Sequence, residues 1–190
     1  MNLKERIVSK ITERISVFDE DGIYALSLLV EESGYDEEKI PLISLGYNTE
    51  KFCGKADELS EDRWNYAMWI QNNEPLLDTK DETELKKWFC EQGISDVGET
   101  ENEDEMYNEN FEYIGKGPKG YFEFINFVAA TVCEMKNRGM FGKYNSLPVI
   151  IHDYEYSWYT LEATEKANPD GEANAFLQYI DATANIEFDE

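Results

Sequence analysis

The chain contains a single histidine, His152, and any catalytic arrangement built on an imidazole would have to use it. This residue follows the apolar run Val149–Ile151 and precedes Asp153, at the end of an expected strand, where catalytic side chains are often found. No G-x-S-x-G or H-E-x-x-H motif accompanies it to supply a nucleophile or a second metal ligand. We therefore interpret His152 as a structural residue.

A glycine-rich segment, Gly115–Gly120, fits the pattern G-x-G-x-x-G and precedes an expected helix. In dinucleotide sites such glycines let the backbone approach a pyrophosphate at a helix N-terminus. In such sites an acidic residue further along the chain binds the ribose, but Asp153, the candidate here, follows too late in the sequence. No repeated strand-helix-strand pattern surrounds the motif either. Lys116 and Lys119 still form an island of positive charge, so they are candidates, with His152 and Asp153, for an anion or ligand site. A flexible loop before the helix is the simpler interpretation.

Metal and cofactor sites find no other support in the sequence. Asp19–Gly22 begins like a calcium loop, but Tyr24 and Val30 stand where an EF-hand needs glycine and glutamate. The three cysteines are too widely spaced for a zinc knuckle or a C-x-x-C motif: Cys53, Cys90 and Cys133. We expect no metal, no cofactor and no catalytic residue.

Negative charge is the dominant property of the chain. Its 190 residues include 41 Asp and Glu against 17 Lys and Arg, a net charge of −24. Such a field repels nucleic acid and anionic membrane surfaces, so we expect neither as a partner. It would attract a basic protein and speed the encounter with it. Solubility alone is the other interpretation of the charge.

The acidic residues are most concentrated between Glu91 and Gly115, a segment with nine carboxylates and no basic residue. Like charges at this density repel one another, so we expect residues Ser95–Asn110 to form a loop or a loose helix. We predict that this run contacts the partner through seven carboxylates: Glu99, Glu101, Glu103, Asp104, Glu105, Glu109 and Glu112.

The elements that would position these residues follow from the spacing of apolar side chains. A period of three to four predicts helices over Asn2–Phe18, Asp81–Gln92, Tyr121–Arg138, Ser157–Lys166 and Glu172–Ala182. Alternation predicts strands over Ile23–Glu31, Pro41–Tyr47, Arg63–Gln71 and Leu147–Tyr156. Ile23–Glu31 is apolar on both faces and should be central, and its short connection to the next strand predicts an antiparallel pair.

The order of these elements lacks regular β-α-β alternation and predicts an α+β fold. We expect a single domain over residues 1–190, with a mostly antiparallel sheet of about four strands packed with helices. The first residues are charged, unlike an export signal, and no apolar run reaches the length of a membrane span. The free thiols and the missing signal predict a cytoplasmic protein, and its oligomeric state stays open.

Three segments resemble a bacterial family of uncharacterised proteins, domain of unknown function 4303. They are G-I-Y-A-L-S-L-L from Gly22, S-L-G-Y-N-T-E from Ser44 and R-W-N-Y-A-M-W from Arg63, and Val149–Asp153 is similar to the family's last strand. The resemblance covers nearly the whole chain and implies a similar order of helix and strands. It implies no activity and no catalytic residues.

The negative charge and the expectation of a small cytoplasmic protein together suggest a non-enzymatic acidic binding protein, similar to immunity proteins that neutralise bacterial toxins. Its partner would be a basic protein such as a nuclease-like toxin domain. One alternative is a small-ligand-binding protein or enzyme with a cleft near His152 and Asp153. Another is an acidic mimic of nucleic acid, in which spaced carboxylates imitate phosphates.

Overall fold

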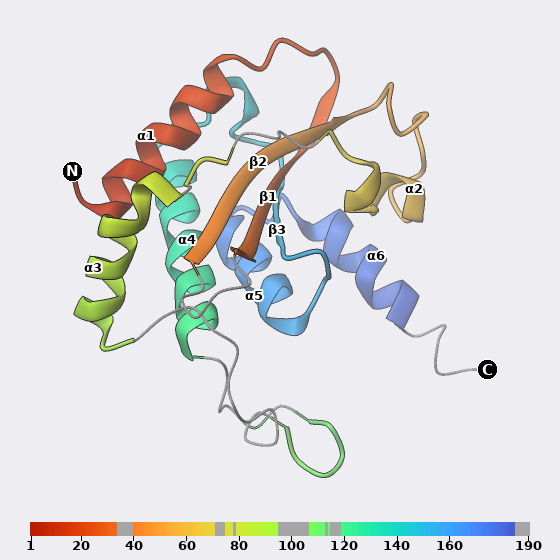
Figure 1. Ribbon diagram of the computed structural model, residues 1–190. Helices are drawn as coiled ribbons and strands as arrows, with labels where there is room; N and C mark the ends of the chain where they lie inside the picture. The colour runs from red at the N-terminus through yellow and green to blue at the C-terminus, as the bar shows by residue number, and fades with distance from the viewer. Residues whose placement is uncertain are drawn as a thin grey trace.

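The computed structural model describes residues 1–33, 40–70, 75–77, 79–94, 107–112, 114 and 119–184. In these ranges the chain forms one three-stranded sheet with helices packed on both of its faces (Figure 1). The predicted α+β class is confirmed. No helix in these ranges is both long and apolar enough to cross a membrane.

The sheet has the order β2-β1-β3, built from β1 (Ile23–Ser33), β2 (Ile40–Thr49) and β3 (Val149–His152). Strand β1 is central, as its apolar faces predict, and pairs with β2 antiparallel. Strand β3 pairs with β1 in parallel, with Leu29 opposite His152. The expectation of about four mostly antiparallel strands is therefore wrong for the described residues, because one of the two pairings is parallel.

The missing strand is the one predicted over Arg63–Gln71. This segment forms two short helical pieces, α2 (Glu61–Trp64) and η1 (Tyr66–Met68). Asn65 lies between them, and its side chain accepts a hydrogen bond of 3.0 Å from the backbone N–H of Ala67. Asparagine favours such turns because its side chain competes with the ladder for backbone partners.

The alternating residues Trp64, Tyr66, Met68 and Ile70, which predicted the strand, do not share one buried face, because Trp64 is buried whereas Met68 is exposed. Trp64 and Trp69 are both buried, with ring centroids 6.4 Å apart. Among the described residues of this segment, Ile70 is the one whose backbone pairs with the sheet, in an isolated antiparallel bridge with Tyr47. The preceding residues Lys51–Lys55 are turns.

One face of the sheet carries the larger apolar core, covered by α1 (Leu3–Ser16), α3 (Glu82–Gln92) and α4 (Lys119–Asn137) (Figure 1). Helix α1 begins in a capping box, in which Asn2 and Glu5 each accept a hydrogen bond from the other's backbone N–H. Its apolar stripe is buried at every fourth position: Leu3, Ile7, Ile11 and Ile15.

The other face carries a second apolar cluster, covered by α2 and by α6 (Asn174–Ala184) (Figure 1). A β-bulge between Ile23 and Ala25 in β1 places Tyr24 and Ala25 together in this cluster. Its buried members come from five parts of the chain: Tyr24, Ala25, Trp64, Trp69, Ile150, Ala173, Phe176 and Tyr179.

Helix α5 (Trp158–Ala167) closes the outer edge of β3 with its side chains. Asn168, which follows the helix, accepts from the backbone N–H of Val149 and donates to its carbonyl, both at 2.9 Å. Thr164 accepts from the N–H of Ile151 at 2.9 Å. Because these groups take the ladder positions of β3, no further strand can pair with it there.

We expect Asn168→Ala to lower the free energy of unfolding by about 2–3 kcal/mol, because it leaves buried backbone groups of Val149 without partners. Urea unfolding measures this change. Asn137→Ala on the exposed side of α4 is the matched control and should shift the free energy by less than about 0.5 kcal/mol. Equal effects of the two substitutions would contradict the edge-closing role of Asn168.

Candidate functional site

His152 lies at the end of β3 and is completely buried. Its Nε2 is 2.7 Å from the hydroxyl of Ser27 on β1, and its ring stacks on that of Tyr66 at a centroid distance of 4.7 Å. Burial lowers the pKa of the imidazole to about 3, so the ring is neutral at physiological pH. A side chain in this position supports the packing of η1 on the sheet and cannot meet a substrate from solvent.

Asp153, the next residue, turns to different surroundings. It is half-buried and accepts a hydrogen bond of 2.6 Å from the hydroxyl of Tyr159 on α5. Burial raises the pKa of this carboxyl above its usual value. Of the two lysines expected to complete an anion site, Lys116 lies outside the described residues, and Lys119 begins α4 with a side chain that is not described.

The predicted acidic contact run lies mostly outside the described residues, which include neither Glu99, Glu101 and Glu103 nor Asp104 and Glu105. Its last two members, Glu109 and Glu112, are described and exposed.

The described end of this run is attached to α5. The indole N–H of Trp158 donates to the hydroxyl of Tyr107 at 3.0 Å. Asn108 donates to the carboxylate of Glu112 at 2.7 Å, and Phe111 beside them is 87% exposed. This end of the run is therefore accessible to a partner.

Sequence reasoning missed a polar joint that ties α2 to the sheet. The guanidinium of Arg63 donates two hydrogen bonds to the carboxylate of Glu50, at 2.7 and 3.2 Å, and a third to the carbonyl of Ala56 at 3.2 Å. It also lies over the ring of Tyr24, 3.9 Å from the centroid. These contacts hold the pKa of the Glu50 carboxyl below its usual value.

The backbone of Arg63 takes part in the same joint. Its carbonyl accepts hydrogen bonds from the hydroxyl of Tyr24 and from the indole N–H of Trp69, the latter at 3.1 Å. Asn48 donates to the Tyr24 hydroxyl at 2.9 Å. The residues of the N-T-E and R-W segments thus meet in one place. Because the Arg63 side chain is only 11% exposed, the joint is structural and is not itself a binding site.

Outside this joint lies a strongly acidic surface, which we name the α2 face. It consists of residues 57–68 together with Tyr154 and Glu155, which follow β3. Arg63 is the only cationic residue of the segment 57–68, and it is paired. The face exposes carboxylates and apolar side chains together: Asp57, Glu58, Glu61, Asp62 and Glu155, with Leu59, Met68 and Tyr154.

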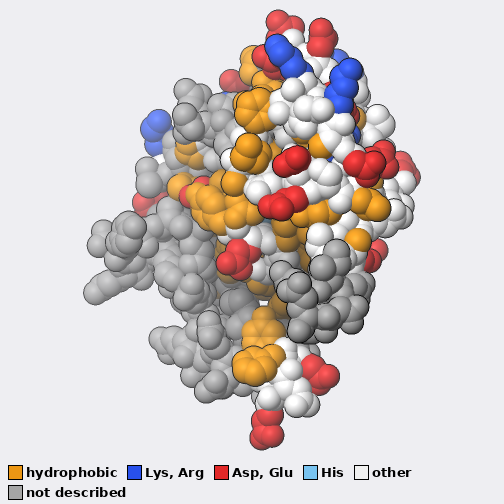
Figure 2. Space-filling model, turned by 90° about the vertical axis from the view of Figure 1, so that its right-hand side faces the viewer, with side chains coloured by type: hydrophobic (Ala, Val, Ile, Leu, Met, Phe, Trp, Pro, Cys, Tyr) orange, Lys and Arg blue, Asp and Glu red, His pale blue; other side chains and the backbone are white. Residues whose placement is uncertain are grey.

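Figure 2 views the molecule from the side of α2 and α6. Carboxylates stand among exposed apolar side chains across the middle of this view, while Lys and Arg lie toward its upper end and one edge. The surface is therefore both anionic and partly apolar, a combination that suits contact with a protein better than solvation alone.

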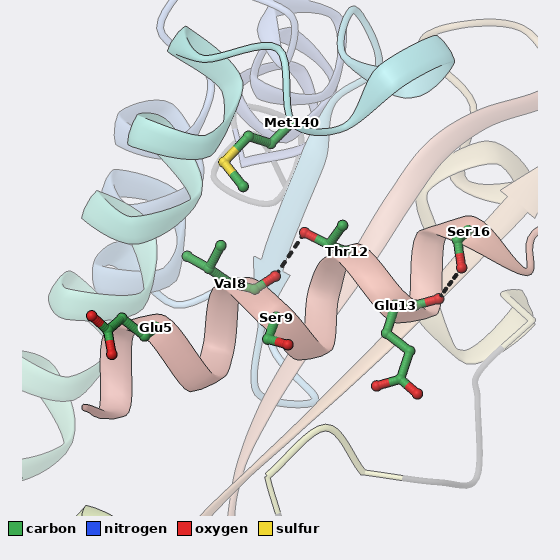
Figure 3. Close-up of a pocket in the computed structure, with 7 residues that line it drawn as sticks. All are labelled: Glu5, Val8, Ser9, Thr12, Glu13, Ser16 and Met140. Carbon is green, nitrogen blue, oxygen red and sulfur yellow. Dashed lines mark hydrogen bonds between the residues drawn. The ribbon is translucent and has the colours of Figure 1, made fainter. Parts of the chain in front are cut away.

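Two depressions lined by described residues lie elsewhere on the molecule. One runs along the exposed side of α1, where Val8 lies across from Met140 in the turn after α4 (Figure 3). The hydroxyls of Thr12 and Ser16 in it donate to carbonyls of their own helix, at 2.8 and 2.6 Å, so they offer a ligand little. The other lies between the first turn of α1 and Trp88 of α3. Neither includes a predicted site residue.

Metal ligands do not gather in the described part of the chain, where no group of three or more His, Cys, Asp or Glu side chains could hold an ion. The three cysteines are free thiols.

Comparison with known proteins adds no relative. No protein-family model matches the chain, and searches of curated proteins and of solved structures find no match. The resemblance to domain of unknown function 4303 therefore stays a prediction.

Because His152 is the only histidine, its imidazole proton signals in an NMR spectrum need no assignment. We expect their chemical shifts to stay constant from about pH 8 to pH 5, since burial keeps the pKa of the ring far below the ordinary value of about 6.5. A titration with a midpoint near 6.5 would contradict the burial of this ring.

The same pKa shift predicts how stability depends on pH. The unfolded chain protonates its histidine below pH 6.5, whereas the folded chain does not, so acidification favours unfolding. The contribution is fully present above pH 6.5 and falls by about 1.4 kcal/mol per pH unit below it. Relative to His152→Gln, which does not titrate, the wild type should lose about 2 kcal/mol between pH 7 and pH 5. Parallel curves for the two proteins would refute this.

Proposed function

We propose that this chain is a non-enzymatic acidic binding protein whose partner is a basic protein, in the manner of an immunity protein that neutralises a nuclease-like toxin. The α2 face carries this proposal, because it exposes five carboxylates and three large apolar side chains around one paired arginine. A surface of this kind steers a cationic partner and then holds it by apolar contact.

The ion pairs of the fold leave the excess of carboxylates in place. Within the described residues they engage at least six of the chain's basic side chains: Lys4, Arg6, Arg63, Lys86, Lys136 and Arg138. Lys136 is buried, where its ammonium donates to Glu172 at 2.6 Å and to two backbone carbonyls. Each pair cancels one carboxylate together with one cation, so the net charge of −24 remains to attract a basic partner.

The buried position of His152 also favours binding over catalysis. The one imidazole of the chain is neutral, inaccessible and bonded to Ser27, so it offers no general base to a bound substrate.

The proposal predicts that a gene next to this chain's gene encodes a basic protein, and calorimetric titration of the chain with that protein tests it. We expect a complex with one copy of each protein, and its Kd should rise at least about tenfold between about 50 and 500 mM salt, because screening weakens the charge contribution. Polyglutamate at equal carboxylate concentration is the control for charge alone. No binding at low salt, or equal binding of polyglutamate, would refute the proposal.

A further inference from the structure

Two tyrosines of the α2 face meet at the carboxyl ends of β1 and β3. Tyr66 belongs to η1 and Tyr154 follows β3, and their ring centroids are 6.4 Å apart with the planes inclined at 62°. Tyr154 is 52% exposed. In the parallel pairing Leu29 lies opposite His152, so Glu31 comes near Tyr154 two residues further on, and burial together with this carboxylate raises the pKa of Tyr154 to about 12.

Carboxylates surround both rings. The negative charges of Glu155 and Asp153 act on Tyr66 and, after burial, are the causes that raise the pKa of its hydroxyl. Glu31 acts on Tyr154 in the same sense. Glu31 and Glu155 therefore lie near this pair of aromatic rings, whereas the carboxylate of Asp153 bonds Tyr159 on α5.

Packed neighbours hold the ring of Tyr66 in place. One contact of Tyr66 is the neutral imidazole of His152, stacked at 4.7 Å, and another is the edge-on ring of Tyr156 at 5.5 Å. Tyr156 is fixed in turn by a hydrogen bond from its hydroxyl to the carbonyl of Trp64. A ring held by packed neighbours binds a partner with little further loss of conformational entropy.

From this arrangement we propose that the basic partner inserts an arginine or lysine side chain against Tyr66 and Tyr154, next to Glu31 and Glu155. Aromatic faces attract cations, and a nearby carboxylate can bond a guanidinium through two hydrogen bonds. Met68, also exposed, extends the contact with apolar surface.

Charge selects this occupant over a second copy of the same chain. Each copy carries a net charge of −24, so two α2 faces would repel each other, whereas a basic segment complements the face. The inference rests on the proposed function and names the surface at which it operates.

The test is an NMR titration of the full chain with a probe, acetyl-tetra-arginine amide, at low salt. We expect Tyr154→Ala to raise the Kd of the peptide by about two- to fivefold, the range of an exposed cation–aromatic contact. Tyr154→Phe, which keeps the ring, should bind like the wild type. Glu155→Gln should raise the Kd by about twofold or more.

Matched controls come from the other described acidic segment. Phe111→Ala removes an aromatic residue that is even more exposed than Tyr154, and Glu109→Gln removes one charge as Glu155→Gln does. Both should leave the Kd within about twofold of the wild type. Equal effects at both places would overturn the proposed docking site while leaving a basic partner possible. No binding of the peptide to the wild type at low salt would overturn the docking site and count against a basic partner as well.

Discussion

The burial of one arginine side chain, Arg63, constrains how α2 packs on the sheet. A guanidinium leaves water only where its charge finds a partner, and the two terminal nitrogens of Arg63 reach Glu50 and the carbonyl of Ala56, while the group lies over the ring of Tyr24. These partners come from β1 and from the chain after β2, so α2 cannot separate from the sheet without breaking the ion pair of Arg63 with Glu50. The position of Tyr66 over His152, and with it the shape of the α2 face, depends on this joint.

Sequence patterns correctly predicted the helices and strands whose buried positions follow from the spacing of their own apolar residues. Helix α1 follows from apolar residues at every fourth position, and β1 is central because both of its faces are apolar. The strand predicted over Arg63–Gln71 was wrong because the alternation of this segment also fits a turn. Contacts with residues distant in the sequence decide between the two structures. Asn65 ends α2, and the pairing of Arg63 with Glu50 pulls the segment across the sheet. Strand β3 is shorter than predicted, and side chains of α5 occupy its outer edge, which hydrophobic periodicity does not encode.

Only the negative charge of the candidate surface could be predicted from the sequence. An excess of carboxylates follows from composition, but the α2 face joins residues 57–68 to Tyr154 and Glu155, about 90 residues later in the chain, through the packing of Tyr66 on His152. Most of the acidic run from Glu99 to Glu112 lies outside the described residues, so its predicted contact stays a prediction. The structure adds a second acidic surface whose aromatic residues are held by the fold.

The negative charge of the chain and the exposed residues of the α2 face together support the claim that this face contacts a basic protein. Zero-length carbodiimide crosslinking of the complex tests this claim most directly, because it joins only carboxylates and lysines in contact. The account predicts crosslinks from Glu58, Glu61, Asp62 and Glu155 to lysines of the partner. Crosslinks confined to other exposed carboxylates, such as Glu123 and Glu134 on α4, would contradict it.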